Sequence, residues 1–356
     1  MQSRFFRTAA PALALAVAGL AAPAAQALDI VFRDVGPTPM SSAQFAAFES
    51  AASLWKSKLS DHLTVYIDIG FDDLGGGTLA TTTWAQYGLS YGDLRSRLAA
   101  DATSAADTSA VTHLQAGTSL SFMATLPGNV RHLDNDGSAN NRQLLLTTAN
   151  AKALGVLNPG TNESSPDARI RFSNAYAGNF AYSRSGGVPY DKIDFISVAE
   201  HEIGHALGFV SGVDAIDYCL DHAAQCGTAG GFEAGSWYYS LDLLRYSAPG
   251  TLDVAVGGAP YLSLDGGATA LQGFSTGAAH GDGSQASHFL NGSNTLMRPI
   301  VPWGQSFTTT DADLLALDAI GWNLTNPVPE PQTYALLLSG LAVLGWARRR
   351  RGGVSA

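Results

Sequence analysis

Basic side chains are scarce in this sequence. Its 356 residues contain 20 lysines and arginines against 30 aspartates and glutamates, and charged residues make up only 14% of the chain. Six of the basic residues and one acidic residue lie in the two terminal segments described below, so the body between them carries a net charge of about −15. This acidic body argues against a nucleic-acid partner, which would need a basic surface. It favours solubility outside the cell and leaves calcium as a secondary candidate ligand.

Cysteine is almost absent, because only Cys219 and Cys226 occur. In an exported chain, two cysteines this close in sequence are typical of one disulfide that closes a short loop. Zinc ligation is the competing interpretation, but the Cys-x6-Cys spacing fits the usual zinc-ligand spacing poorly. We therefore predict a Cys219–Cys226 disulfide.

The chain also lacks an apolar run of the length typical of a transmembrane helix. Its first apolar run, residues 9–22, follows two arginines, and residues 25–27 read Ala-Gln-Ala, an A-x-A cleavage site. Residues 1–27 are therefore predicted to be a secretory signal peptide, and the mature protein is expected to begin near Leu28. A buried or membrane-spanning helix is the weaker alternative.

The C-terminal residues have a three-part order. Residues 328–331 read Val-Pro-Glu-Pro, residues 334–347 form an apolar stretch, and four arginines follow at 348–351. The arginines are expected to hold that end of the stretch on the cytoplasmic side. Over residues 327–356 this order resembles the PEP-CTERM sorting signal of Gram-negative bacteria, which exosortase-type machinery processes. The resemblance implies an exported protein with a transient inner-membrane anchor, later released or attached at the cell surface; a plain C-terminal anchor is the alternative.

Residues 28–326 are long enough for one large domain or two lobes with an ample core. Alternating apolar runs predict strands, and apolar residues at helical spacing predict helices. The predicted strands cover residues 29–32, 63–71, 79–84 and 170–173. The predicted helices cover residues 41–59, 91–114, 148–154, 190–207 and 311–322, and a hairpin is predicted around Asp265-Gly266.

The most informative stretch is His201-Glu202-Ile203-Gly204-His205. Two histidines four residues apart lie on the same face of an α-helix, so both imidazoles can reach one metal ion. Glu202 stands beside the first histidine, where its carboxylate can take a proton from a metal-activated water. Gly208 then allows the chain to leave the helix at positive φ. Histidines that are merely hydrogen-bonded in a buried helix are the alternative, but the complete motif predicts zinc.

A catalytic zinc needs three protein ligands and an open position for water. The wider motif, His201-Glu202-x-x-His205-x-x-Gly208, resembles the metzincin clan of zinc metallopeptidases, but the position of that clan's usual third histidine is here Ser211. A Leu-Met-Arg-Pro string at 296–299 is similar to the metzincin Met-turn, in which a methionine lies beneath the ligands. The leishmanolysin-like branch inserts a long segment and presents its third histidine shortly before that turn. The resemblance therefore implies His288 as the third ligand and Met297 as the Met-turn methionine.

Other side chains remain open as the third ligand, with Asp214 next after His288. The candidates are Asp214, Asp217, His222, Glu233 and His280. The string Asp-Asn-Asp-Gly-Ser at 134–138 is typical of the start of a calcium loop, but the remaining EF-hand positions are absent. We therefore predict a solvated turn there.

The metzincin resemblance implies an α+β fold. It would have a mixed twisted sheet and the active-site helix in an N-terminal lobe, about 28–210, and a loop-rich C-terminal lobe, about 211–326. An edge strand at 78–84 would border the cleft and pair with an extended protein or peptide substrate. The implied activity is a zinc endopeptidase with one catalytic Zn²⁺ and Glu202 as general base. The alternative is a non-catalytic zinc-containing surface or extracellular-matrix protein of the same fold, although such a structural site needs no base at Glu202.

Overall fold

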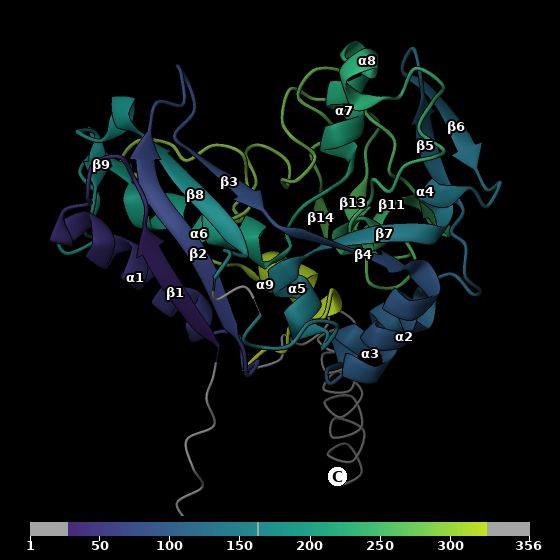
Figure 1. Ribbon diagram of the computed structural model, residues 1–356, viewed down its shortest axis with the longest axis horizontal. Coiled ribbons are helices and arrows are strands. Elements are labelled where there is room, and N and C mark those ends of the chain that lie inside the picture. Colours follow the sequence, from purple (N-terminus) through teal and green to yellow (C-terminus); the bar gives the residue numbers. More distant parts are fainter. Residues whose placement is uncertain (1–27, 162–163, 326–356) are drawn as a thin grey trace, which may run out of the picture.

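The computed structural model describes residues 28–161 and 164–325 (Figure 1). The predicted signal peptide, residues 1–27, and sorting signal, residues 327–356, lie outside the described residues. Within the part of the chain that is described, no helix combines the length and apolarity needed to cross a membrane. Figure 1 shows a sheet with its helices on the left, beside a group of hairpins, loops and short helices on the right.

The main sheet has four strands in the order β1-β2-β8-β3. They are β1 (Asp29–Asp34), β2 (Thr64–Asp72), β8 (Ala168–Ser173) and β3 (Ala80–Trp84). The first three strands are parallel, with Ile30 opposite Val65 and Ile69 opposite Ile170. β3 runs antiparallel to β8 and forms one edge of the sheet. The four predicted strands are confirmed with small differences at their ends, and the strand expected to border a cleft is an edge strand.

Two helices pack together beside this sheet, α1 (Ser42–Lys56) and α6 (Phe195–Leu207). The ring of Phe48 in α1 lies 5.3 Å from that of Phe172 in β8 and 5.1 Å from that of Phe195 in α6. The indole nitrogen of Trp55 donates a hydrogen bond of 2.8 Å to the carbonyl of Glu200 in α6. These contacts fix the position of α6, the helix that carries the HExxH motif.

The right-hand part of Figure 1 includes two sheets of two strands each and several short helices. β4 (Gln86–Ser90) pairs with β7 (Gln143–Thr147), and β5 (Phe122–Leu126) pairs with β6 (Val130–Asp134). The helices of this stretch are α2 (Tyr91–Asp101), α3 (Ala105–His113), α4 (Ala139–Arg142) and α5 (Thr148–Ala153).

The single helical segment predicted at 91–114 is wrong in one respect, because the chain leaves the helix between α2 and α3. Ser104 has extended backbone and caps α3: its hydroxyl accepts from the amide of Asp107, whose carboxylate accepts from the Ser104 amide. This reciprocal capping box stabilises a new helix start by about 1 kcal/mol. The Ser-x-x-Asp pattern was visible in the sequence and marks the break.

The remaining elements are short, and long loops connect several of them. They are η1 (Asn174–Tyr176), β9 (Phe180–Ala181), β10 (Ile193–Asp194), α7 (Val213–Asp221), α8 (Ala223–Cys226), η2 (Ser240–Leu244), β11 (Arg245–Ala248), β12 (Thr251–Leu252), β13 (Tyr261–Leu262), β14 (Gln272–Gly273) and α9 (Asp311–Ala319). The hairpin predicted around Asp265-Gly266 is confirmed as the antiparallel β13–β14 pair, although its connection is longer than a two-residue turn. The predicted C-terminal helix is α9, which ends at Ala319 because Gly321 follows with a φ of 105°.

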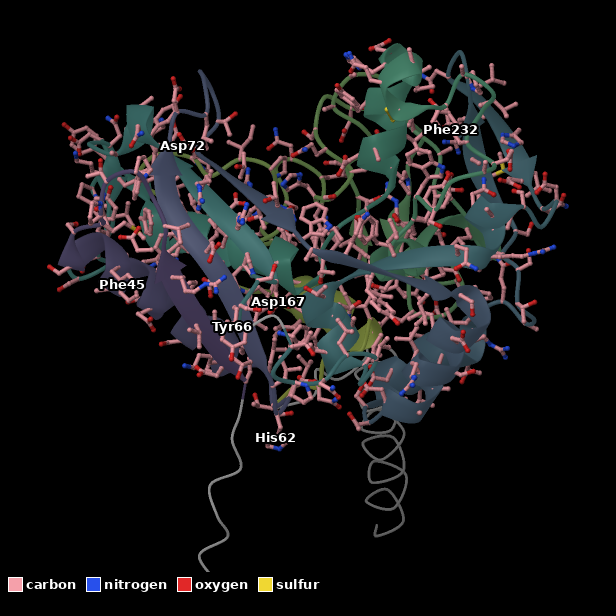
Figure 2. All side chains as sticks on the ribbon, in the orientation of Figure 1. Phe45, His62, Tyr66, Asp72, Asp167 and Phe232 are labelled. Atoms are coloured by element: carbon pink, nitrogen blue, oxygen red, sulfur yellow. A yellow bond between two sulfur atoms is a disulfide. The ribbon has the colours of Figure 1, made fainter. Side chains whose placement is uncertain are left out.

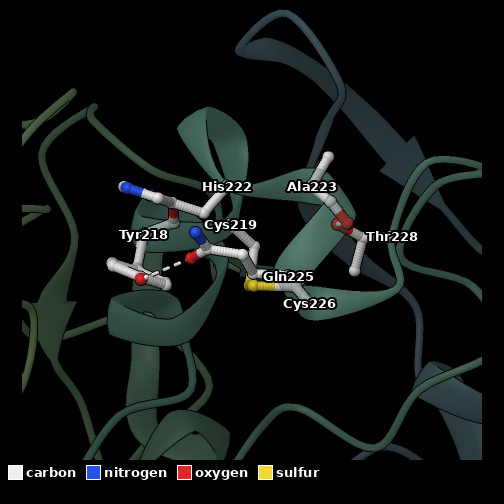
Figure 3. Close-up of a disulfide and its surroundings, with 7 residues drawn as sticks. All are labelled: Tyr218, Cys219, His222, Ala223, Gln225, Cys226 and Thr228. Atoms are coloured by element: carbon white, nitrogen blue, oxygen red, sulfur yellow. Dashed lines mark hydrogen bonds between the residues drawn. A yellow bond between two sulfur atoms is a disulfide. The ribbon is translucent and has the colours of Figure 1, made fainter.

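The predicted disulfide is confirmed (Figure 3). Cys219 at the end of α7 bonds to Cys226 at the end of α8, with their Cα atoms 5.8 Å apart. The bond closes the turn between the two helices, where the ring of His222 stacks on that of Tyr218 with centroids 4.0 Å apart.

The described residues form two hydrophobic cores. One joins the main sheet to α1, α6 and α9, and the other joins residues 91–157 to residues 213–286. The second core therefore contains residues from both of the predicted lobes, which meet at about residue 210. Asp167, which lies just before β8 and is labelled in Figure 2, forms a buried ion pair of 2.7 Å with Lys152 in α5. Asp167 also accepts from the amide of Tyr66 and the hydroxyl of Thr148.

Candidate metal centre

The site is built on α6, which is buried along its whole length. Asp194 caps its first turn by accepting from the amide of Ser197 at 3.0 Å. The helix ends at Gly208, whose φ of 120° is open to glycine and strained for other residues. His201 and His205 lie one turn apart and face the same side, as the sequence predicted.

The structure brings His288 to these two histidines from the long loop after β14. The Nε2 atom of His201 lies 3.1 Å from that of His288 and 3.0 Å from that of His205. One nitrogen from each of the three rings lies within 4.8 Å of the others. The three imidazoles therefore converge on one point, although 87 residues separate His201 from His288 in the sequence.

The other ring nitrogen, Nδ1, faces a backbone carbonyl in each histidine. The carbonyls belong to Leu296 for His201 (2.9 Å), Phe209 for His205 (2.7 Å) and Gln285 for His288 (3.2 Å). A carbonyl only accepts hydrogen bonds, so each Nδ1 carries the ring proton and each Nε2 presents a lone pair. Burial lowers the pKa of His201 to about 4 and that of His205 to about 3, and lowers the pKa of His288 well below its usual value, so the rings are neutral at pH 7.

Three converging lone pairs form a donor set that could hold a cation. With zinc–nitrogen bonds of about 2.0–2.1 Å, tetrahedral geometry places the nitrogens about 3.3 Å apart, which is close to the 3.0–3.1 Å between these Nε2 atoms. Three neutral imidazoles with oriented Nδ1 protons are also the donor chemistry that zinc prefers. The residues at this point therefore fit a zinc ion with one position open.

Glu202 lies beside the three histidines and lines the same cavity. Its Oε2 accepts a hydrogen bond of 2.6 Å from the hydroxyl of Thr82 in β3. Burial raises the pKa of Glu202 to about 7, and the Thr82 hydrogen bond opposes the rise. A carboxylate with a pKa near neutrality is suited to accept and return a proton.

Met297 lies under the centre and is fully buried. A Cβ on Gly204 would lie only 2.6 Å from the Met297 sulfur, so the absence of a side chain at Gly204 makes room for the methionine. Asp313 in α9 holds the turn that contains Met297, because its carboxylate accepts from the amides of Leu296 (2.9 Å) and Met297 (3.0 Å). The carbonyl of Leu296 in turn accepts from His201.

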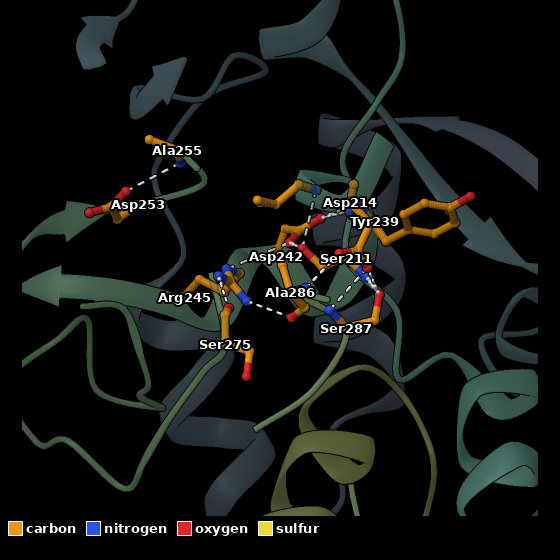
Figure 4. A network of polar contacts seen from close by, with 12 residues as sticks. Ser211, Asp214, Tyr239, Asp242, Arg245, Asp253, Ala255, Ser275, Ala286 and Ser287 are labelled. Carbon is orange, nitrogen blue, oxygen red and sulfur yellow. Dashed lines mark hydrogen bonds and ion pairs between the residues drawn. The ribbon is translucent and has the colours of Figure 1, made fainter. Parts of the chain in front are cut away.

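A polar network positions the chain just before His288 (Figure 4). Asp214, the second candidate for the third ligand, accepts from the amides of Ala286 and Ser287 and from the Ser287 hydroxyl. The buried guanidinium of Arg245 donates to the carbonyl of Ala286 at 3.0 Å. Asp214 therefore fixes the position of the two residues that precede His288.

A second part of the network holds the chain at Ser211, where the sequence lacks the usual metzincin histidine. Asp242 accepts from the hydroxyl of Ser211 (2.5 Å) and from the amides of Gly212 and Tyr239 (both 2.8 Å). The Asp242 carboxylate lies 4.0 Å from Arg245, so the two halves of the network are joined.

The other candidate ligands have different partners. Asp217 accepts from the amides of Ala279 and His280 at 2.8 and 2.9 Å, and the His280 ring lies 3.1 Å from Asp221. The remaining two, His222 and Glu233, pair with Tyr218 and Ser138 respectively. Among the described residues, the structure groups His201 and His205 with His288 alone.

The centre opens into a cavity of about 820 Å³. Its lining includes residues 77–82 and Trp84, which cover most of the edge strand β3, and residues 298–301. Tyr218 and Tyr239 also line it. The cavity is large enough for several residues of an extended chain.

Sequence reasoning missed four residues of this site: Thr82, Asp242, Arg245 and Asp313. Asp313 stands at the third position of a Thr-x-x-Asp capping box, a pattern visible in the sequence, but its contacts with Leu296 and Met297 depend on tertiary packing. The sequence carried no comparable signal for the other three.

Comparison with known protein families gives a match that lies at the C-terminus. Residues 327–351 match the PEP-CTERM protein-sorting motif, which confirms the sorting signal predicted from the sequence. The motif implies export, membrane-associated sorting and recognition by exosortase-type machinery in a Gram-negative bacterium. No curated protein and no solved structure matches the chain. The motif match lies outside the residues of the histidine centre.

Proposed function

We propose that this exported protein is a zinc-dependent endopeptidase with a metzincin-like, two-lobed fold. The observation that carries the proposal is the convergence of His201, His205 and His288 on one point beside Glu202, inside a cavity of about 820 Å³. A purely structural zinc site is normally closed by four protein ligands, whereas three ligands facing a cavity leave a position for water.

The chain's own residues divide the chemistry between them. The Nε2 atoms of His201, His205 and His288 would hold a zinc ion, which would supply Lewis acidity to a water and to a substrate carbonyl. Glu202 accepts the proton of the attacking water and passes it to the leaving amine, a role supported by its place beside the three histidines in the same cavity. Thr82 orients the Glu202 carboxylate, and Met297 supports the helix from below through Gly204.

The substrate is a protein or peptide that binds in extended form along β3. This edge strand lines the cavity, and on its other side it is paired with β8. An extended peptide can add to such an edge through main-chain hydrogen bonds, which fixes its register without demanding a particular sequence. After processing of the sorting signal, the enzyme acts at the cell surface or outside the cell.

Replacing Glu202 with glutamine tests the proposal. The Glu202→Gln protein should bind as much zinc as the wild type and lose cleavage of casein and of fluorogenic peptides by at least about 100-fold, because general-base catalysis of this kind contributes about 10²–10⁴-fold. Glu200→Gln is the matched control: Glu200 is the next glutamate on the same helix, but its carboxylate accepts from Thr308. Equal cleavage by wild type and Glu202→Gln would exclude Glu202 as the base.

The third ligand is tested by comparing His288→Ala with Asp214→Ala. We expect His288→Ala to lose zinc and activity together. Asp214→Ala should keep zinc at saturating concentration but bind it more weakly, because Asp214 acts on the backbone at Ala286 and Ser287. Full zinc content and activity in His288→Ala would assign the third ligand elsewhere. A zinc-loaded wild type that cleaves neither casein nor peptides would instead favour the alternative in which the chain is a non-catalytic surface or matrix protein.

A further inference from the structure

A second group of side chains that could hold a metal ion lies near β6 and α4, which are labelled toward the right-hand edge of Figure 1. It consists of His132 and Asp134 in β6 and Glu233 in the loop after the disulfide. One ligand atom from each of the three lies within 4.8 Å of the others. His132 and Asp134 point to the same face because they are two residues apart in a strand.

His132 is the unusual member of this group. Its Nδ1 atom is buried, and no hydrogen-bond partner for it exists among the described residues. A buried ring nitrogen without a partner has lost its hydrogen bonds to water without replacing them, which is unfavourable. Two carboxylates each have an oxygen within 4.8 Å of a ring nitrogen of His132, and neither of them is hydrogen-bonded to Nδ1.

The two carboxylates are already oriented by other groups. The side-chain amides of Asn140 and Asn141 donate to the two oxygens of Asp134 at 2.8 and 3.0 Å. The hydroxyl of Ser138 donates to Glu233 at 2.7 Å. Each carboxylate oxygen keeps a second lone pair for a metal, and such outer hydrogen bonds are typical of residues that bind metals.

Charge also favours a cation at this position. Asp134 is only 3% exposed, and among the described residues neither Asp134 nor Glu233 has an ion pair. A buried carboxylate without a positive partner is costly, so a divalent ion would offset two negative charges at once. Asp134 is also the first residue of the Asp-Asn-Asp-Gly-Ser string at 134–138, whose start is similar to that of a calcium loop.

We propose that His132, Asp134 and Glu233 form a second metal site for a divalent transition metal of the zinc class. An imidazole with two carboxylates suits zinc or manganese, whereas calcium prefers oxygen ligands alone. Two ligand atoms on one zinc ion lie about 3.4 Å apart, so side-chain movements of at most about 1.5 Å would close the group around the ion.

This second site has a structural role. It joins the β5–β6 hairpin and α4 to the loop that carries Glu233, whose carbonyl also accepts from the amides of Ala139 and Asn140. Glu233 itself lies in a loop outside the named helices and strands, so a metal there would stabilise the position of this loop against the β5–β6 hairpin. It is independent of the three-histidine centre and of the proposed peptidase activity.

The test is the zinc content of the purified protein after removal of metal with a chelator and reloading with Zn²⁺. His132→Gln and Glu233→Gln should each hold one zinc per chain fewer than the wild type and should lose part of the rise in melting temperature that zinc causes. His113→Gln is the matched control, because His113 is an exposed histidine in α3 outside both groups. Because the measurement is a difference between variants, it does not depend on what the three-histidine centre holds.

Equal zinc content in wild type, His132→Gln and Glu233→Gln would overturn the proposal, and so would occupancy by Ca²⁺ instead of Zn²⁺ in a parallel reloading. A measurement on the wild type covers the case in which a variant fails to fold. Zinc should slow hydrogen–deuterium exchange at C2 of the His132 ring by at least about tenfold, as read by mass spectrometry of the histidine-containing peptides. An unchanged exchange rate at His132 at saturating zinc would also overturn it.

Discussion

Replacing Asp313 with alanine should weaken zinc binding at the three-histidine centre, although Asp313 is not a ligand. Its carboxylate accepts from the amides of Leu296 and Met297 and from the amide and hydroxyl of Thr310. The Leu296 carbonyl then accepts from Nδ1 of His201. Asp313 therefore fixes the turn that sets the tautomer and orientation of the first histidine.

The magnitude follows from the groups left without partners. Asp313→Ala leaves the buried amides of Leu296 and Met297 unpaired, at about 1–3 kcal/mol each, so the free energy of unfolding should fall by about 2–6 kcal/mol. Loss of an outer partner of a metal-binding histidine lowers metal affinity by about 10–100-fold. Asp313→Asn keeps one acceptor oxygen and should show a smaller loss of both quantities.

The assay is competition for zinc with a chelator of known affinity, with thermal unfolding of the same samples measured in parallel. Asp311→Ala is the matched control, because Asp311 is exposed at the start of the same helix. If Asp313→Ala loses stability while its dissociation constant for zinc stays within about threefold of wild type, the Leu296–Met297 turn does not govern His201. That result would refute the reasoning.

Three further predictions concern other parts of the molecule. Thr82→Val removes the hydroxyl that orients Glu202, so kcat/KM for peptide cleavage should fall by about tenfold with unchanged zinc content; an unchanged kcat/KM would contradict the role given to Thr82. Burial and then nearby acidic groups raise the pKa of Asp318 to about 7, so the folded state binds the extra proton and stability falls as pH rises from about 4 through 7. Relative to wild type, Asp318→Asn should therefore be more stable at pH 8 than at pH 5, by up to about 2–3 kcal/mol in urea unfolding, and an equal difference at both pH values would argue against it. Asp167→Ala should cost about 3–5 kcal/mol in the same assay because it leaves Lys152 buried without its partner, and the double replacement with Lys152→Met should recover much of the loss; if the double variant is as unstable as the single one, the ion pair is not the cause.

The elements around the centre could be predicted from sequence because their signals are local. The HExxH spacing and the apolar stripe predicted α6, and alternating residues predicted β1 and β2. The β4–β7 pair was not predicted, since residues 86–90 are mostly polar or small and their pairing partner lies more than 50 residues away. Strand order depends on such long-range pairing, which periodicity does not encode.

At the site, too, the local elements could be predicted from sequence and the long-range contacts could not. His288 and Met297 could be named only because a family resemblance supplied the long-range relation between them and α6. The residues that hold them, Asp214, Arg245 and Asp313, bind backbone groups rather than side chains. Backbone amides and carbonyls carry no sequence identity, so no pattern of residue types indicates which loop a buried acid will hold.

Buried aspartates stabilise the long loops that carry His288 and Met297, because they accept hydrogen bonds from the backbone amides of these loops. Residues 274–310 contain no named helix or strand within the described chain, so their amides and carbonyls need partners other than a regular ladder. Asp214, Asp217 and Asp313 supply them, each accepting at least two backbone amides from this segment. Desolvation of a buried carboxylate raises the free energy of the folded state. Hydrogen bonds from backbone amides offset part of this rise and fix the position of the backbone. In a chain with few charges, the buried acids therefore act mainly as anchors for the loops that carry His288 and Met297, and changes at these acids should alter metal affinity before they alter the main sheet.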